Sequence, residues 1–363
     1  MSLSPELITL PGWSVPAAAP RGYSDCSLVI PTYKRMDEIR RLLTMLSRLP
    51  DLPAEVVVID GTPNGTVEAA IAEWVRSRRL PFTLIYARSE PGLTRQRNAG
   101  IDLSCGRFVF FLDDDCYPEP GYFRVMRDVF LADTGGSVGG LAGCVVNEID
   151  RPIPIRWRIR LAIGLTPRIP PMSYHPSGTS TPRGLMKPFS GVRAVDVLPG
   201  CAFALRREVL NRERFSAFFE GYSQGEDMEM SLRVRRHWAL LCCGDARARH
   251  EAAPGGRPDP YRKGFMEVRN RYFIWKRYSP DAGRLDRFRF WADVVFLATM
   301  DLAWYLRRPW KLDDLRHARG LLAAVRSIQS GSKIPVEPPA RRQFVLASVV
   351  RAASPSHAGA DRP

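Results

Sequence analysis

The chain has 363 residues, of which 45% are apolar and 25% charged, and its formal net charge is +15. This ordinary globular composition excludes a chain too poor in apolar residues to fold, and it is sufficient for one large α/β domain with an appendage or for two smaller domains. A surface this basic favours anionic partners such as nucleic acid, an acidic membrane or phosphate-bearing substrates. The charge alone does not choose among them.

The cysteine pattern indicates free thiols. The seven cysteines are odd in number, form no CxxC pair and in several cases lie inside apolar runs. This fits buried thiols in a reducing compartment better than a disulfide framework. The first ten residues, MSLSPELITL, lack the basic region and long apolar run of a signal peptide. We therefore expect a cytoplasmic protein, located at the inner face of the membrane if it contacts lipid.

The first part of the chain alternates continuous apolar runs with amphipathic segments. The apolar runs, which predict strands, are 26–30, 56–59, 82–87 and 107–112, and the first of them stops at Pro31. Between them, apolar residues recur at helical spacing after Arg35 and from Val67 to Val75. This alternation predicts an α/β fold with a mostly parallel central sheet flanked by helices. Ligands of such sheets bind beyond the carboxyl ends of the strands.

The second part of the chain is less regular. Residues 151–193 are rich in proline and basic residues and contain no acidic residue, so we interpret them as a long excursion over the surface. Regular structure is expected again as strands at 138–146, 195–205 and 239–243 and as a helix at 225–238. After about residue 280 the chain becomes helical, aromatic and basic, and its last residues have the composition of a disordered tail.

An acidic triplet follows the fourth predicted strand directly, in LDDDCYPEP. Side chains alternate in extended backbone, so Asp113 and Asp115 project to one side and Asp114 to the other. Two carboxylates on one side form a hard-oxygen site that suits Mg²⁺ or Mn²⁺. The alternative is a solvated acidic loop, but three adjacent like charges next to a buried strand repel one another without a counter-ion.

The sequence resembles the family 2 glycosyltransferases, which have the GT-A fold. The matching segments, in the order of the family, are LVIPTYKR, VVVIDGT, GLTRQRNAGI, FVFFLDDDCYPEP, LPGCAFALRREV and GEDMEMSLRVRR. Any one of them is modest support, and six in order are strong support. The resemblance covers roughly residues 25–280.

The resemblance assigns donor-binding roles to residues near the strand ends. By the resemblance, the nucleotide and its diphosphate are held by Pro31, Thr32, Tyr33, Asp60, Arg97, Asn98, Asp113 and Asp114. Two of these residues also have a plainer interpretation. An aspartate before a glycine, such as Asp60, is often a turn former. Arg97, in its plainer interpretation, belongs to an exposed basic helix start. Arginine suits phosphate because its fork of donors matches the oxygen geometry.

The resemblance also implies a metal site and a catalytic pair. The DxD motif of the family falls on Asp113 and Asp115, with Asp115 as the direct ligand of Mn²⁺ or Mg²⁺ and His250 as either a further ligand or a structural residue. Glu226 and Asp227 match the family's ED pair at a helix start. Asp227 is then the general base and Glu226 positions the acceptor, whereas for an isolated ED pair, helix capping would be the plainer interpretation.

The resemblance implies transfer of a sugar from a nucleotide-diphosphate donor to the hydroxyl of a glycan, a lipid-linked molecule or a small molecule, with inversion. The absence of a QxxRW motif argues against a processive synthase. Two alternatives are a sugar-phosphate nucleotidyltransferase and a non-catalytic basic binding module. The first would carry a glycine-rich phosphate loop where this chain has PTYKR. The second lacks any nucleic-acid-binding motif, so no nucleic-acid partner is expected.

These patterns divide the chain into an irregular lead-in (1–24), a nucleotide-binding half (25–135), an acceptor half (136–280), an amphipathic helical extension (281–345) and a disordered tail (346–363). Within the extension, at 284–310, the apolar run of 290–306 is interrupted by Asp293 and Asp301 and is slightly short for a membrane span. Its aromatic residues and arginines fit a peripheral membrane helix and a helix packed on the domain equally well.

Overall fold

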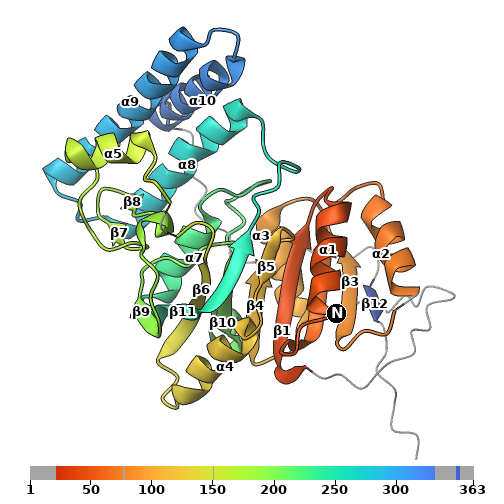
Figure 1. Ribbon diagram of the computed structural model, residues 1–363. Helices are drawn as coiled ribbons and strands as arrows, with labels where there is room; N and C mark the ends of the chain where they lie inside the picture. The colour runs from red at the N-terminus through yellow and green to blue at the C-terminus, as the bar shows by residue number, and fades with distance from the viewer. Residues whose placement is uncertain (1–21, 77, 150, 332–348, 352–363) are drawn as a thin grey trace, which may run out of the picture.

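The protein is described by a computed structural model that covers residues 22–76, 78–149, 151–331 and 349–351. One large sheet runs through the molecule, with helices on both of its faces, and a group of helices projects from one end (Figure 1). Most of the expected lead-in, residues 1–21, lies outside the described residues, and the first strand already begins at Tyr23.

Within the described residues, the central sheet has ten strands. Across the sheet they are β12 (Val349–Arg351), β3 (Thr83–Arg88), β2 (Pro53–Asp60), β1 (Tyr23–Thr32), β4 (Phe108–Leu112), β10 (Ala202–Arg206), β6 (Val138–Val145), β11 (Ala239–His250) and β5 (Cys116–Pro118), with β9 (Val192–Ala194) also paired to β11. Strands β3, β2, β1 and β4 are parallel, β10 is antiparallel to both of its neighbours, and β11 is parallel to β6. This arrangement confirms the predicted α/β class with a central sheet flanked by helices.

Helices cover the sheet because its strands are apolar on both faces. The helices are α1 (Met36–Leu46), α2 (Thr66–Arg76), α3 (Leu93–Leu103), α4 (Tyr122–Ala132), α5 (Ile155–Ala162), α6 (Arg207–Arg212), α7 (Glu226–Val234), α8 (Pro260–Tyr278), α9 (Arg284–Arg307) and α10 (Leu312–Gln329). Leu28 and Ile30 of β1 share a core with α1, α2 and α4, whereas Val29 shares the opposite core with α3, α6 and α7. On that second face, a Cβ at Gly100 would lie 2.2 Å from Cγ1 of Val29, so α3 packs this closely only because residue 100 is a glycine.

The first strand extends past Pro31, where the sequence predicts its end. Pro31 pairs with Ile59 of β2, and Thr32 pairs with Asp60. The ladder between β1 and β4 already ends at Val29. Proline, which has no N–H to donate, is tolerated at position 31 because β4 no longer pairs with β1 there. The extension places Thr32 and Asp60 side by side at the edge of the sheet.

The basic segment 151–193 contains more structure than the predicted excursion. It holds α5, a hairpin of β7 (Tyr174–His175) and β8 (Thr179–Ser180), and the short 3₁₀ helix η1 (Arg183–Leu185). Its arginines find their acidic partners elsewhere in the chain: Nη2 of Arg156 contacts Asp301 at 2.5 Å, and Nε of Arg160 contacts Asp293 at 2.6 Å. Because both partners belong to α9, these ion pairs hold α5 against the C-terminal helices.

The C-terminal helices form a small core of their own. Val268 and Trp275 of α8, Phe290 and Leu297 of α9, and Leu321 of α10 are buried together. In the described part of the chain, we find no helix with the length and apolar character needed to span a bilayer. One face of α9 packs against protein in this core, in line with one of the two interpretations, and its carboxylates Asp293 and Asp301 lie on that buried face.

Two further features concern the cysteines and the end of the chain. Six of the cysteines are buried free thiols, and Cys105 is exposed. Strand β12 lies within the segment expected as a disordered tail and pairs antiparallel with β3. The other residues of that segment lie outside the described residues.

Candidate active site

Three potential metal ligands meet at the edge of the sheet. Asp113 and Asp115 lie in the turn between β4 and β5, and His250 is the last residue of β11. Strand β5 pairs with β11, and this pairing places His250 opposite Cys116. One ligand atom from each of the three residues lies within 4.8 Å of the others. The turn and the strand pairing thus bring together the residues that the sequence predicts as a metal site.

The chemistry of this cluster fits a divalent cation. The side chain of Asp115 is only 3% exposed, and its Oδ1 atom is buried without a hydrogen-bond donor. Nε2 of His250 lies 3.3 Å from that oxygen. A buried carboxylate oxygen without a donor is costly, and a cation would compensate it. Two carboxylates and an imidazole form a ligand set that suits Mn²⁺.

A second carboxylate orients the imidazole of His250. Nδ1 of His250 lies 2.9 Å from Oε1 of Glu148. Burial lowers the pKa of His250, but the nearby carboxylates of Asp115 and Glu148 outweigh it and raise the pKa to about 10. A carboxylate on the far nitrogen is the usual partner of a metal-bound histidine, because it fixes the ring orientation. Sequence reasoning missed Glu148, which follows β6 in no recognisable motif.

Asp114 projects away from the cluster, as the alternation of side chains predicts. Its Oδ2 accepts a hydrogen bond from Oγ1 of Thr32 at 2.8 Å, and its Oδ1 accepts one from Nη1 of Arg35 at 2.8 Å. Burial raises the pKa of Asp114 to about 7, although Arg35 and Thr32 oppose this shift. Both oxygens are therefore engaged with the end of β1, so Asp114 supports the site from behind.

Arg35, the last residue of the PTYKR segment, ties a loop to the acidic turn. Its Nη1 also lies 3.1 Å from Oδ2 of Asp115, and its Nε donates to the carbonyl of Gly255 at 2.8 Å. The backbone N–H of Ala253 donates to the same Asp115 oxygen at 2.7 Å. These bonds fold the loop after β11 over the metal cluster. Sequence reasoning quoted this arginine within a motif but gave it no role.

Arg97 joins the two acidic motifs. Its side chain is 1% exposed, and its Nη1 donates to Oε1 of Glu226 at 2.6 Å. Its Nη2 donates to Oδ1 of Asp113 at 3.3 Å and to the carbonyl of Gly200 at 2.7 Å. The sequence analysis expected this guanidinium to bind the diphosphate. In the structure it is buried and bonded to protein carboxylates, because the DxD and ED motifs converge around it.

The ED pair lies at the start of α7. Glu226 is buried, and burial together with the charge of Asp227 raises its pKa to about 8, against the effect of Arg97. Asp227 is half-buried, and its Oδ2 accepts a hydrogen bond from the N–H of Gly200 at 2.9 Å. Asp227 is thus the more accessible carboxylate of the two. The resemblance implies that Glu226 positions the acceptor, whereas the structure places its side chain in the interior, bonded to Arg97.

Gly200 is a junction that the sequence analysis did not single out. A Cβ at this position would lie 3.2 Å from both Oδ2 of Asp227 and Oε1 of Glu226, and 3.3 Å from Nη2 of Arg97. The backbone of Gly200 bonds to Asp227 through its N–H and to Arg97 through its carbonyl. A residue without a side chain lets all three groups approach. The signal in the sequence is the LPGC segment that precedes β10.

Two other residues predicted to bind the donor are engaged with the protein. The carboxylate of Asp60 is fully buried and accepts hydrogen bonds from the N–H of Thr62 at 2.8 Å and from the hydroxyl of Tyr86 at 2.6 Å. The amide of Asn98 bonds to both the N–H and the carbonyl of Phe215. Asp60 therefore shapes the turn after β2, and Asn98 fixes the segment between α6 and α7. Their contacts with a donor stay predictions.

The residues at the end of β1 lie on the same edge. Pro31 and Thr32 are buried, and Tyr33 is half-buried. Nε2 of Gln96 donates to the carbonyls of Thr32 at 2.7 Å and Ile59 at 2.8 Å, so α3 holds the ends of β1 and β2 together. Gln96 lies inside GLTRQRNAGI and was not assigned a role from the sequence.

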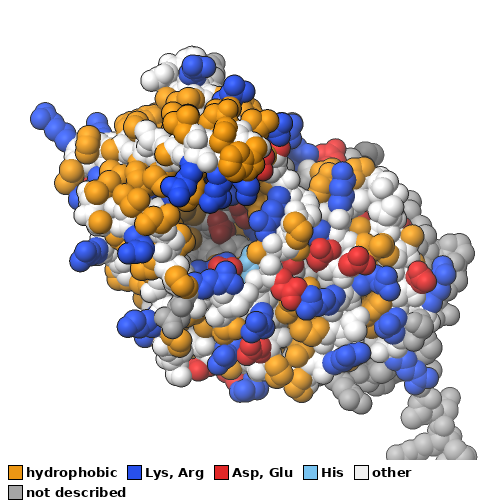
Figure 2. Space-filling view, turned by 45° about the horizontal axis from the view of Figure 1, so that its top comes forward, with side chains coloured by type: hydrophobic (Ala, Val, Ile, Leu, Met, Phe, Trp, Pro, Cys, Tyr) orange, Lys and Arg blue, Asp and Glu red, His pale blue; other side chains and the backbone are white. Residues whose placement is uncertain are grey.

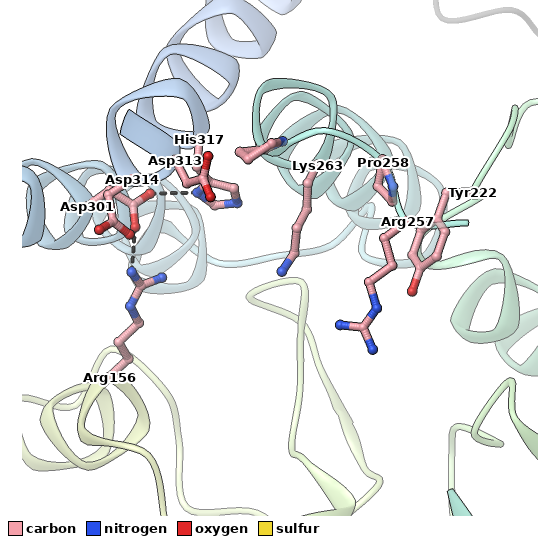
Figure 3. Close-up of a pocket in the computed structure, with 10 residues that line it drawn as sticks. Arg156, Tyr222, Arg257, Pro258, Lys263, Asp301, Asp313, Asp314 and His317 are labelled. Atoms are coloured by element: carbon pink, nitrogen blue, oxygen red, sulfur yellow. Dashed lines mark hydrogen bonds and ion pairs between the residues drawn. The ribbon is translucent and has the colours of Figure 1, made fainter. Parts of the chain in front are cut away.

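A cavity of about 360 Å³ lies between the loop after β11, α5 and the C-terminal helices. Its lining residues are Arg156, Tyr222, Arg257, Pro258, Pro260, Lys263, Asp301, Asp313, Asp314 and His317. Arg257 and Lys263 point into it from the loop after β11 and from α8 (Figure 3). Nε of Arg257 donates to the carbonyl of Ala253, whose N–H bonds to Asp115, so the cavity adjoins the metal cluster. Figure 2 shows a hollow with acidic side chains at its bottom and basic ones along its rim.

Comparison with known proteins gives the family. The model of glycosyl transferase family 2 matches residues 27–212, which is just over half of the chain. The chain belongs to glycosyl transferase family 2. The matched region contains Asp113, Asp115 and Arg97, whereas Asp227 and His250 lie beyond its end.

Relatives match this family 2 chain over a limited share of its length. It is 29% identical over 108 residues to the uncharacterized glycosyltransferase YwdF of Bacillus subtilis, a match that covers 30% of this chain and 39% of the relative. It is 31% identical over 96 residues to the glycosyltransferase AglE of Haloferax volcanii, covering 26% of this chain and 31% of the relative. The match thus spans less than two-fifths of either relative.

A solved structure shows the same fold over most of the chain. The mannosyltransferase PcManGT from Pyrobaculum calidifontis, solved in complex with GDP-Man and Mn²⁺, superposes with a TM-score of 0.50 at 17% sequence identity. The superposition covers 86% of this chain and 89% of that protein. The family 2 chain therefore has the GT-A fold that the sequence predicts.

Proposed function

We propose that this protein is a glycosyltransferase that moves a sugar from a nucleotide-diphosphate donor to an acceptor hydroxyl, with inversion and with a divalent cation. The observation that carries the proposal is the convergence of Asp113, Asp115 and His250 at the sheet edge, joined to the ED pair through Arg97. The solved Pyrobaculum structure holds GDP-Man and Mn²⁺, which supports the same ligand class on this fold.

In this proposal the donor diphosphate lies over the metal cluster. Asp113, Asp115 and His250 would hold the cation, and Glu148 fixes the ring of His250. A cation held there would supply positive charge to offset the charge of the departing diphosphate. Arg257 and Lys263 add positive charge from the cavity wall, where guanidinium and ammonium groups suit phosphate oxygens. They take the phosphate-facing role that the sequence analysis gave to Arg97.

Asp227 acts on the acceptor. The acceptor oxygen forms a bond to the anomeric carbon from the side opposite the diphosphate, while the bond to the diphosphate oxygen breaks. The proton of the acceptor hydroxyl passes to the carboxylate of Asp227, which Gly200 holds in place through its N–H. The cavity beside the cluster, with Tyr222 at its wall, is the volume through which the acceptor enters.

A thermal-shift panel tests the donor site. UDP-, dTDP- and GDP-sugars are added to the protein with Mn²⁺ or with EDTA. Because a ligand that binds only the native state raises the melting temperature, at least one nucleotide sugar is expected to raise it, and only when Mn²⁺ is present. The proposal would be contradicted if no nucleotide sugar raised the melting temperature with any divalent cation.

A further inference from the structure

The outer face of α9 is apolar although its inner face carries two carboxylates. Phe288, Val295, Leu302 and Leu306 are 66%, 61%, 46% and 70% exposed. Their spacing of seven, seven and four residues places them on one side of the helix. Asp293 and Asp301 lie on the opposite, buried side. The helix thus buries two carboxylates beside Phe290 and Leu297 and leaves four large apolar side chains facing solvent.

Exposed apolar residues concentrate in α9 and the neighbouring α5 segment. Nine of the sixteen large exposed apolar side chains in the described part of the chain lie in residues 151–168 and 284–311. These nine are Ile153, Ile155, Ile163, Leu285, Phe288, Val295, Leu302, Leu306 and Trp310. Figure 2 shows apolar side chains gathered over the C-terminal helices. Large exposed apolar patches rimmed by polar residues mark interaction sites.

The exposed charges within these two segments have one sign, and the exposed carboxylates of Asp281 and Asp313 lie just outside them. Among the described residues of 151–168 and 284–311, every exposed charged side chain is basic, namely Arg151, Arg158, Arg168, Arg284, Arg287, Arg307, Arg308 and Lys311. The acidic residues of the same segments are buried, or, in the case of Asp286, half-buried within 3.6 Å of Arg289. The surroundings of the apolar face are therefore complementary to an anionic surface.

We propose that the outer face of α9, with α5 beside it, docks on an anionic lipid surface. Apolar side chains of an amphipathic helix enter the boundary between headgroups and acyl chains, and flanking basic residues attract anionic headgroups. Trp310, which is 74% exposed just after α9, suits the same interface. A second copy of this chain is a poorer occupant, because it would bring two sets of arginines together.

Docking has a consequence for the cavity beside the metal cluster. Arg156 of α5 and Asp301 of α9 line that cavity from the inner side of the same two helices (Figure 3). Lipid contact through the outer side would hold the cavity close to the membrane surface. The proposal does not depend on the proposed transfer reaction, because lipid binding is measured without any substrate.

Vesicle sedimentation tests the proposal with the full chain. We expect the protein to bind vesicles of phosphatidylcholine mixed with phosphatidylglycerol, more weakly at high salt, and to bind pure phosphatidylcholine poorly. The double variant Phe288→Ser with Leu306→Ser should lower the partition coefficient by at least about tenfold. Leu131→Ser on α4 is the matched control, because Leu131 is also exposed but lies outside both segments. Its binding should equal that of the wild type.

A spectroscopic readout locates the contact. Mixed vesicles should shift the tryptophan emission of the wild type to shorter wavelength, and Trp310→Phe should remove most of this shift. The proposal is overturned if the folded wild type does not bind mixed vesicles, or if the double variant binds as tightly as the wild type. It is also overturned if light scattering shows a dimer that the double variant dissociates, since a second copy would then cover this face.

Discussion

The guanidinium of Arg97 and the carboxylate of Glu226 form an ion pair with 2.6 Å between Nη1 and Oε1, and both side chains are almost completely buried. The two residues are 129 positions apart in the sequence. Arg97 comes from α3 in the nucleotide-binding half, and Glu226 begins α7 in the acceptor half. This pair therefore connects the parts of the protein that would hold the donor and the acceptor.

Replacing Arg97 by methionine should destabilise the protein strongly. The substitution leaves Glu226 buried without its partner, and breaking a buried ion pair in this way costs about 3–5 kcal/mol. Urea denaturation measures the loss. Adding Glu226→Gln to Arg97→Met should restore part of the stability, because no buried charge then lacks a partner. A loss below about 1 kcal/mol in the single variant would show that the pair does not hold these elements together.

Asp227→Asn should separate donor binding from transfer. The amide keeps the size of the side chain but does not accept the acceptor proton, so the transfer rate should fall by about 10²–10⁴-fold. Donor binding, measured by thermal shift, should stay near that of the wild type. Asp128→Asn is the control, since Asp128 is an exposed carboxylate on α4. Full turnover by Asp227→Asn would remove this residue as the base.

Gly200→Ala should lower activity more than stability. The new Cβ would crowd Asp227 Oδ2 and Glu226 Oε1 at 3.2 Å, so the carboxylates must move by a few tenths of an ångström. Because small misplacements at a reacting centre are costly, we expect a loss of about tenfold or more in the transfer rate. Gly135→Ala is the matched control, since a Cβ there has no neighbour within 4 Å. Equal activities of the two variants would contradict this role of Gly200.

Much of the fold follows from local sequence patterns. The runs of apolar residues before Pro31, Gly61 and Asp113 predict strands, and the structure has β1, β2 and β4 there. The DDD turn predicts the separation of Asp114 from its neighbours because backbone alternation is a local property. The convergence of Asp113 and Asp115 with His250 was expected only from the family resemblance, because no local pattern links residues this far apart.

What the sequence missed are contacts between distant segments. Glu148 meets His250, and the arginines of the basic segment meet the carboxylates of α9, across 102 to 145 positions. The absence of acidic residues in 151–193 led to its interpretation as a surface excursion. No local pattern in the sequence shows where the acidic partners of its arginines lie. Likewise, Arg97 was assigned to phosphate by its type, whereas its burial between two acidic motifs is a property of the tertiary fold.

The C-terminal helices should lose stability as the pH rises. Nδ1 of His317 lies 2.6 Å from Asp301 and its Nε2 lies 3.2 Å from Glu267. Burial lowers the pKa of His317, but these carboxylates outweigh it and raise the pKa from 6.5 to about 9. The folded protein therefore binds this proton more tightly than the unfolded chain. The resulting stabilisation is fully present below pH 6.5 and is lost as the pH rises toward about 9.

Thermal melts between these pH values measure the effect of His317. We expect the wild type to lose on the order of 1–2 kcal/mol across the window, and His317→Asn to show a flatter profile. The exposed His237, at the end of α7, gives the control variant His237→Asn, which should follow the wild type. A profile of His317→Asn as steep as that of the wild type would contradict the assignment.

Mn²⁺ binding tests the central claim most directly. Titration followed by electron paramagnetic resonance, with a nucleoside diphosphate present, compares the wild type with Asp115→Asn and Glu148→Gln. We predict that the wild type binds the ion, that Glu148→Gln binds it about 10–100-fold more weakly, and that Asp115→Asn loses the site. Failure of the wild type to bind Mn²⁺, or unchanged binding by Asp115→Asn, would contradict a metal site formed by Asp113, Asp115 and His250.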